Sequence, residues 1–133
     1  MGGAVAAQLA TVQKPAALVL ASTFTSVPAL GAGIYPWLPV RLLARIGYDT
    51  RERLATIAAP VLVIHSRGDD IIPFAHGEQL FAAAKPPKKF LEIEGGHNDC
   101  FVFNREAWVR GLDDFLRSAL EPKAAQTPAA AVQ

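Results

Sequence analysis

A run of four aliphatic residues, Val61 to Ile64, constrains the fold of this chain more than any other stretch. The run follows a proline and shows no alternation of apolar and polar residues, which is typical of a strand buried on both faces of a parallel sheet. A polar turn follows and places Asp69 and Asp70 beyond the strand's carboxyl end. Because catalytic and ligand-binding groups collect at this end of strands in open α/β sheets, the stretch predicts a functional loop as well as a strand.

A histidine stands in the corresponding place after the next predicted strand. Residues 89–94 read as a strand near a sheet edge and are followed by Gly95-Gly96-His97-Asn98-Asp99. We expect the two loops to meet above the sheet, so that an aspartate orients His97 as a general base. Taken alone, Asp69 is also compatible with an ordinary turn, and we expect Asp70 to be a solvated turn carboxylate. Asn98 and Asp99 are expected to shape the histidine loop rather than to react.

The remaining apolar patterns alternate between helix and strand. Val5, Leu9 and Val12 give residues 2–13 the apolar face of a helix, and residues 16–21 form a second continuous apolar strand. Two further helices are predicted over 74–85 and over 105–120, the latter with Asn104 as its N-cap. The resulting order of elements predicts an α/β fold with parallel strands and flanking helices.

The segment between the first two predicted strands has a different composition from the rest of the chain. Its prolines and glycines break it into short pieces, yet it is too apolar for a solvated loop, so we interpret residues 24–58 as a small helical cap insertion. Short helices are expected over 40–46 and 51–57. Four apolar residues of the cap are candidates for a substrate pocket: Phe24, Tyr35, Trp37 and Leu38.

Length and charge limit the classes of function. The chain has 133 residues, 51% of them hydrophobic and 19% charged, which fits one globular domain over 1–120, and the alanine- and proline-rich residues 121–133 predict a disordered tail. A net charge of +1, with no basic patch, argues against binding to nucleic acid. One cysteine, Cys100, permits no internal disulfide, and we expect it to be a small buried side chain.

No cofactor or metal is expected, because the histidines and aspartates lack the spacing of a known metal motif. His65 at a strand end is expected to be packed and hydrogen-bonded, and His76 to lie on the surface. No apolar run approaches the roughly 20 residues that cross a bilayer, and the N-terminus lacks the basic residues of a signal peptide. These features favour a cytoplasmic location, although a membrane anchor in a preceding segment stays compatible with them.

The two loop motifs together resemble those of the α/β-hydrolases, specifically compact serine hydrolases related to serine aminopeptidases and protein depalmitoylases. The family's acid motif, H-G-x-x-D-x-x-[IV]-P, matches residues 65–73, with Ser66 in place of the glycine. Its base motif, G-G-H-N-[DE], matches residues 95–99. The resemblance implies the C-terminal part of an α/β-hydrolase fold, with Asp69 as the triad acid and His97 as the general base.

The family's nucleophile, a serine in G-x-S-x-G at a strand–helix turn, is the part of the pattern that these residues do not supply. Met1, Gly2 and Gly3 resemble the residues that follow that serine. The resemblance therefore implies an oxyanion-hole position at Met1, elbow glycines at Gly2 and Gly3, and a chain that begins just after its nucleophile. Such a chain is expected to be inactive by itself.

Three interpretations of the function follow. The first is a truncated serine hydrolase whose full-length parent cleaves an ester, thioester or amide of a small hydrophobic acyl group. The second is a non-catalytic interaction module with the same fold. The third is a translation start that lies further upstream. Where the preceding strands are absent, the strand over 16–21 would present an unpaired edge, so we expect possible self-association through this exposed sheet edge.

Overall fold

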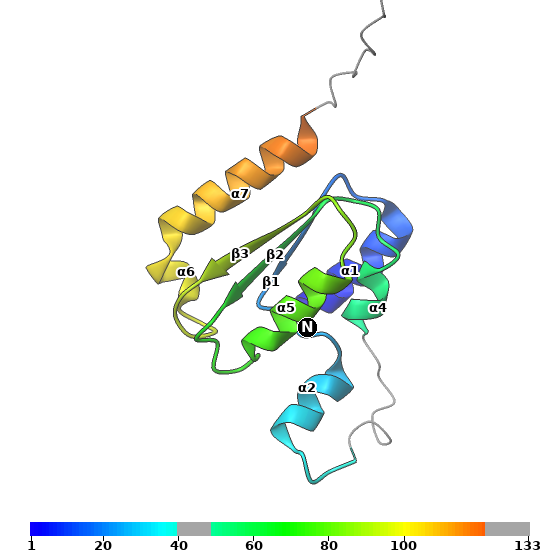
Figure 1. The fold of residues 1–133 in the computed structure, drawn as a ribbon, viewed down its shortest axis with the longest axis vertical. Helices are drawn as coiled ribbons and strands as arrows, with labels where there is room; N and C mark the ends of the chain where they lie inside the picture. Colours follow the sequence, from blue (N-terminus) through cyan, green and yellow to red (C-terminus); the bar gives the residue numbers. More distant parts are fainter. Residues whose placement is uncertain (40–48, 122–133) are drawn as a thin grey trace, which may run out of the picture.

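A computed structural model describes residues 1–39 and 49–121 of the chain (Figure 1). The helix expected over 40–46 and the tail, from residue 122 on, lie outside the described residues. The elements follow in the order α1 (Gly2–Gln13), β1 (Leu18–Ala21), α2 (Val27–Ile34), α4 (Thr50–Leu54), β2 (Val61–Ser66), α5 (Phe74–Ala83), β3 (Lys88–Ile93), α6 (Cys100–Phe103) and α7 (Arg105–Leu120).

The described strands form one parallel sheet in the order β1-β2-β3, which confirms the predicted fold class. Val61 pairs with Leu18 on one side and with Lys88 on the other. All six residues of β2 are buried, as the uninterrupted aliphatic run predicted. Strand β2 is therefore the middle of the described sheet, and β1 and β3 are its edges.

Helices cover both faces of the sheet (Figure 1). On one face, Val61 and Val63 pack with Leu80 of α5 and Leu54 of α4, and α1 belongs to the same cluster. On the other face, α7 supplies the apolar stripe that its sequence predicted, together with buried residues of β2, β3 and α6; this second cluster contains Leu62, Ile64, Ile93, Cys100, Phe115, Trp108, Leu112, Leu116 and Ala119. Alternate side chains of β2 thus pack into two separate hydrophobic cores, one on each face of the sheet.

Helix α1 has the predicted bounds but does not pack through its larger apolar residues. Its buried side chains are alanines, Ala4, Ala7 and Ala10. The predicted face of Val5, Leu9 and Val12 is instead 54%, 57% and 66% exposed, which corrects the expectation that this stripe is the one facing the protein.

The close approach of α1 to the segment after β1 explains why the alanine face of the helix is buried and the face of Val5, Leu9 and Val12 is exposed. A Cβ built on Gly3 would lie 2.1 Å from Oγ1 of Thr23, in the segment that follows β1. The start of α1 is therefore held so near its neighbours that only glycine and alanine fit on the contacting face. Size, rather than hydrophobicity, decides which face of this helix is buried.

Candidate active site

Asp69 and His97 lie together beyond the carboxyl ends of β2 and β3. Nδ1 of His97 is 2.8 Å from Oδ2 and 3.1 Å from Oδ1 of Asp69. The Asp69 side chain is fully buried, whereas that of His97 is 24% exposed. Because an ionised carboxylate only accepts hydrogen bonds, Nδ1 carries the proton, and a neutral His97 keeps a free lone pair on Nε2. Within the described ranges, none of the hydrogen bonds uses Nε2 of His97.

The turn after β2 fixes the carboxylate of Asp69. Oδ1 of Asp69 accepts hydrogen bonds from the backbone N–H groups of Ile71, at 2.9 Å, and Ile72, at 2.7 Å. These local bonds occupy one carboxylate oxygen and direct the other toward the imidazole. The buried charge is therefore satisfied by its own turn as well as by His97.

His65, near the end of β2, contacts the same turn. Its side chain is fully buried, and Nε2 donates to the carbonyl oxygen of Ile72 at 2.9 Å while lying 3.7 Å from Oδ2 of Asp69. A carbonyl can only accept, so Nε2 carries the proton, and within residues 1–39 and 49–121 the buried Nδ1 has no hydrogen-bond partner. The expectation of a packed, hydrogen-bonded His65 is confirmed.

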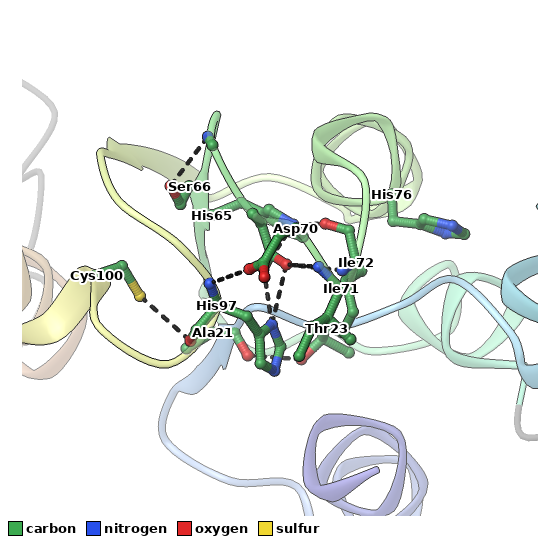
Figure 2. A network of polar contacts seen from close by, with 12 residues as sticks. Ala21, Thr23, His65, Ser66, Asp70, Ile71, Ile72, His76, His97 and Cys100 are labelled. Atoms are coloured by element: carbon green, nitrogen blue, oxygen red, sulfur yellow. Dashed lines mark hydrogen bonds and ion pairs between the residues drawn. The ribbon is translucent and has the colours of Figure 1, made fainter. Parts of the chain in front are cut away.

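The side chain of Asp70 also binds His97, through the backbone N–H of the histidine. Oδ1 of Asp70 accepts the N–H of His97 at 2.9 Å (Figure 2). This hydrogen bond is the largest cause of the lowered pKa of the Asp70 carboxyl, because it stabilises the ionised form. Asp70 is exposed, as expected, but it is not merely a solvated turn residue.

The loop that carries His97 is shaped by a residue that the sequence suggested for another role. Asn104 stands at the N-cap position of α7 but makes no capping hydrogen bond there. Its Nδ2 donates to the carbonyl oxygens of Glu94, at 2.6 Å, and Cys100, at 2.8 Å, and its Oδ1 accepts the N–H of Glu94 at 3.2 Å. Asn104 thus closes the base of the loop. Side chains of Asn98 and Asp99, expected to shape it, have no recorded hydrogen bond among the described residues.

His76 is half-buried rather than free on the surface, which corrects the expectation for it. Nδ1 of His76 lies 2.9 Å from Oγ1 of Thr25 and accepts the Thr25 N–H at 3.2 Å. Burial is the main cause that lowers the pKa of His76. The contact joins α5 to the segment that leads into α2, and no local sequence pattern could indicate it because the partners are 51 residues apart.

Cys100 is fully buried at the start of α6, as expected. Its Sγ lies 3.7 Å from the carbonyl oxygen of His97, at the other end of the histidine loop (Figure 2). Burial and the charge of Asp69 raise the pKa of the thiol, so it stays protonated near neutral pH. A thiol in this state has little nucleophilic character.

The residues expected at the elbow lie at the start of α1. Met1 is exposed and its carbonyl accepts the N–H of Ala4 at 3.1 Å, so it forms the first turn of the helix. Gly3 makes the close contact with Thr23 described above, whereas a Cβ on Gly2 would meet nothing within 4 Å. Packing against Thr23 therefore explains the glycine at position 3. It does not explain the glycine at position 2.

Three of the four candidate pocket residues, Tyr35, Trp37 and Leu38, lie in one turn after α2, whereas Phe24 belongs to a separate buried cluster. Phe24 is buried in a small cluster with Ala4 and Ile72. Tyr35 and Trp37 are exposed and touch each other edge-to-face with ring centroids 6.2 Å apart, and Leu38 is partly buried. A cavity of about 400 Å³ lies nearby, but it is lined by other residues: Thr25, Ser26, Pro28, Ala29, Asp49, Arg51 and Gln79.

Among residues 1–39 and 49–121, no helix is long and apolar enough to cross a membrane. In the same residues, no group of three or more histidine, cysteine, aspartate or glutamate side chains is placed to hold a metal ion.

Comparison of the sequence with known proteins identifies relatives that match between about half and nine-tenths of the chain. An uncharacterized protein of Mycobacterium tuberculosis, Rv2307c, is 51% identical over 117 residues, which is 87% of this chain and 42% of that protein. The human alpha/beta hydrolase domain-containing protein 17B is 34% identical over 70 residues, or 52% of this chain and 24% of that protein. The chain thus spans less than half the length of these relatives. No family model matches it.

Solved structures share the fold at lower sequence identity. The esterase PF2001 of Pyrococcus furiosus superposes with a TM-score of 0.68 at 16% identity, covering 87% of this chain and 50% of the esterase. The enol-lactonase of Burkholderia xenovorans superposes with a TM-score of 0.63 at 18% identity, covering 87% of this chain and 62% of the enzyme. Together with the parallel sheet and the loops at its carboxyl end, these similarities show that the chain has the fold of part of an α/β-hydrolase.

Proposed function

We propose that Asp69 and His97 are the acid and the base of a serine hydrolase that cleaves an acyl ester, thioester or amide. The observation that carries the proposal is the buried Asp69 carboxylate, 2.8 Å from Nδ1 of a partly exposed imidazole. In this arrangement Nε2 of His97 takes the proton of an attacking hydroxyl and later returns it to the leaving group. Asp69 fixes the tautomer and stabilises the imidazolium that forms.

The proposal also needs a nucleophile, which Asp69 and His97 do not supply. By the family resemblance it is a serine in a G-x-S-x-G turn that leads into α1, with the N–H of residue 1 as an oxyanion donor. Because the ring of His97 is hydrogen-bonded only at Nδ1 within the described residues, with no hydroxyl at Nε2, we propose that these 133 residues alone have no His97-dependent hydrolase activity. We further propose a hydrophobic acyl substrate, which the exposed Tyr35 and Trp37 support.

The test compares these 133 residues with a longer polypeptide that continues the same reading frame upstream of residue 1. Both are assayed with short p-nitrophenyl esters and with a fluorophosphonate probe that labels reactive serines. We expect neither turnover nor labelling from the shorter chain. In the longer chain, Asp69→Asn is expected to lower kcat by about 10⁴-fold, as losing the triad acid does in serine proteases, and His97→Ala by at least as much.

Asp114→Asn is the matched control for these variants. Asp114 is an exposed carboxylate on α7, 4.0 Å from Nζ of Lys89 and away from the His97 loop. Its substitution should leave kcat unchanged. Turnover by the 133-residue chain that disappears in His97→Ala would contradict the proposed division of the triad, and full activity of the longer Asp69→Asn variant would contradict the proposed acid.

A second candidate function is that of a non-catalytic interaction module. The exposed apolar face of α1, formed by Val5, Leu9 and Val12, favours it, because a contiguous apolar helix face is typical of a surface that another protein covers. The fluorophosphonate probe separates the two functions. A longer chain that is folded but neither labelled nor hydrolytic would favour the interaction module.

A further inference from the structure

Ser66 connects the two loops of the proposed site. It is the last residue of β2, and its side chain is fully buried. Its hydroxyl donates to the carbonyl oxygen of Gly95, the first residue of the histidine loop, and accepts the N–H of Gly68 in the acid turn at 3.2 Å. One buried hydroxyl therefore ties the turn that carries Asp69 to the loop that carries His97.

The two backbone groups depend on this hydroxyl. Among residues 1–39 and 49–121, neither the Gly95 carbonyl nor the Gly68 N–H has another recorded partner. Gly95 has a φ of +98°, a conformation that favours glycine, and a Cβ on Gly68 would lie 3.1 Å from the Gly95 oxygen. The two loops thus approach each other closely at a point where, within the described ranges, no backbone–backbone hydrogen bond joins Gly68 to Gly95; the nearest one runs from the Arg67 N–H to the Ile93 carbonyl at 3.2 Å.

Other links between the loops are weaker or act at a different place. The Arg67–Glu92 ion pair, 2.7 Å between Nε and Oε1, is exposed, and exposed ion pairs contribute little. The hydrogen bond from the His97 N–H to Asp70 fixes the middle of the histidine loop rather than its first residue. Ser66 is the buried side chain that fixes where the loop begins.

We propose that Ser66 is a positioning residue that sets the Asp69–His97 distance, an inference that rests on the proposed function of this pair. The glycine that the α/β-hydrolase motif places here has no hydroxyl, so the link is a feature of this chain. Ser66 does not touch the imidazole. It acts by keeping the histidine loop in register with the acid turn.

The test measures the hydrogen bond between the pair directly, in the full 133-residue chain. A proton on Nδ1 that is held by a buried carboxylate resonates far downfield in proton NMR and exchanges slowly with water. We expect this signal in the unsubstituted chain and its loss in Asp69→Asn. In Ser66→Ala and Ser66→Gly we expect the proton to exchange with solvent at least about tenfold faster, because the loops separate more often.

Ser118→Ala is the matched control. The hydroxyl of Ser118 also donates to a backbone carbonyl, that of Phe115 at 2.8 Å, but it lies on α7 outside the two loops. Its loss should leave the Nδ1 proton unchanged. Ser66→Gly, which restores the residue of the family motif, keeps the test informative where Ser66→Ala fails to fold.

Kinetics in the longer polypeptide separates this inference from the proposed function. We expect Ser66→Gly to lower kcat by about tenfold or more with little change in KM, because misplacement of a catalytic group costs rate rather than binding. Exchange and kcat values equal to those of Ser118→Ala would overturn the role of Ser66 while leaving the proposed function intact. Absence of the downfield signal from the unsubstituted chain would overturn both. Activity that survives His97→Ala would overturn the proposed function alone.

Discussion

Replacing Asn104 by alanine removes three hydrogen bonds at once from the base of the histidine loop. The amide group joins the residue after β3 to the start of α6, through both backbone groups of Glu94 and the carbonyl of Cys100. Because the local N-cap role is unused, the substitution should leave the start of α7 intact and loosen the loop between residues 94 and 104.

The expected magnitude follows from these contacts. A hydrogen bond contributes a net stability of about 0.5–1.5 kcal/mol, with the lower values where water can replace the partner. The two bonds to Glu94 are exposed and the bond to Cys100 is partly buried. We therefore expect the free energy of unfolding to fall by about 2 kcal/mol, which corresponds to a decrease of about 6–10 °C in Tm for a chain of this size.

Thermal and urea unfolding monitored by circular dichroism measure this loss. Asn98→Ala is the matched control, because Asn98 lies in the same loop, is exposed and has no recorded side-chain hydrogen bond in the described ranges. The control should change stability by less than about 0.5 kcal/mol. Equal effects of the two substitutions would refute the reasoning, since the side-chain contacts of Asn104 would then carry no stability.

Two further predictions concern pH and association. Because burial lowers the pKa of His76 in the folded chain, acidification below about 6.5 protonates the unfolded chain first, so the free energy of unfolding should fall until folded His76 is protonated too. His76→Asn keeps an acceptor for the Thr25 N–H but cannot titrate, and urea midpoints between pH 8 and 5 should decline less steeply in it; equal slopes would contradict the assignment. We also propose that the chain pairs with a second copy of itself through the exposed apolar face of α1 and the adjoining open edge of β1. Sedimentation velocity should show a dimer that Val5→Gln, Leu9→Gln and Val12→Gln together convert to monomer, and a monomeric unsubstituted chain at high concentration would contradict the pairing.

The parts of the fold that could be predicted from the sequence rest on local patterns. The unbroken run of β2 indicated a strand covered on both faces, and the stripe of α7 indicated which side of that helix is buried. The approach of Asp69 and His97 followed from a topological rule, because carboxyl ends of parallel strands share one edge of the sheet. Each inference needed only the spacing of residues and the direction of the strands.

The buried face of α1 could not be predicted in this way. Hydrophobicity favoured Val5, Leu9 and Val12, but the spacing between α1 and the segment after β1 admits only alanine and glycine. That spacing is a property of the assembled fold. The same limit applies to Asn104, whose residue type is typical of an N-cap but whose side chain bonds Glu94, ten residues earlier, and Cys100.

Asp69 and Asp70 show that a site can use more residues than its sequence motif assigns. The motif selects one carboxylate as the acid, and the other was expected to be solvated. In the structure both aspartates bind His97, Asp69 at the imidazole and Asp70 at the backbone N–H. The two neighbours can do so because the Ile71 and Ile72 N–H groups turn the Asp69 side chain inward, whereas Asp70 points outward to the histidine loop. Substitutions at the two positions therefore perturb the same histidine by different routes: loss of Asp69 alters its tautomer, and loss of Asp70 alters its position.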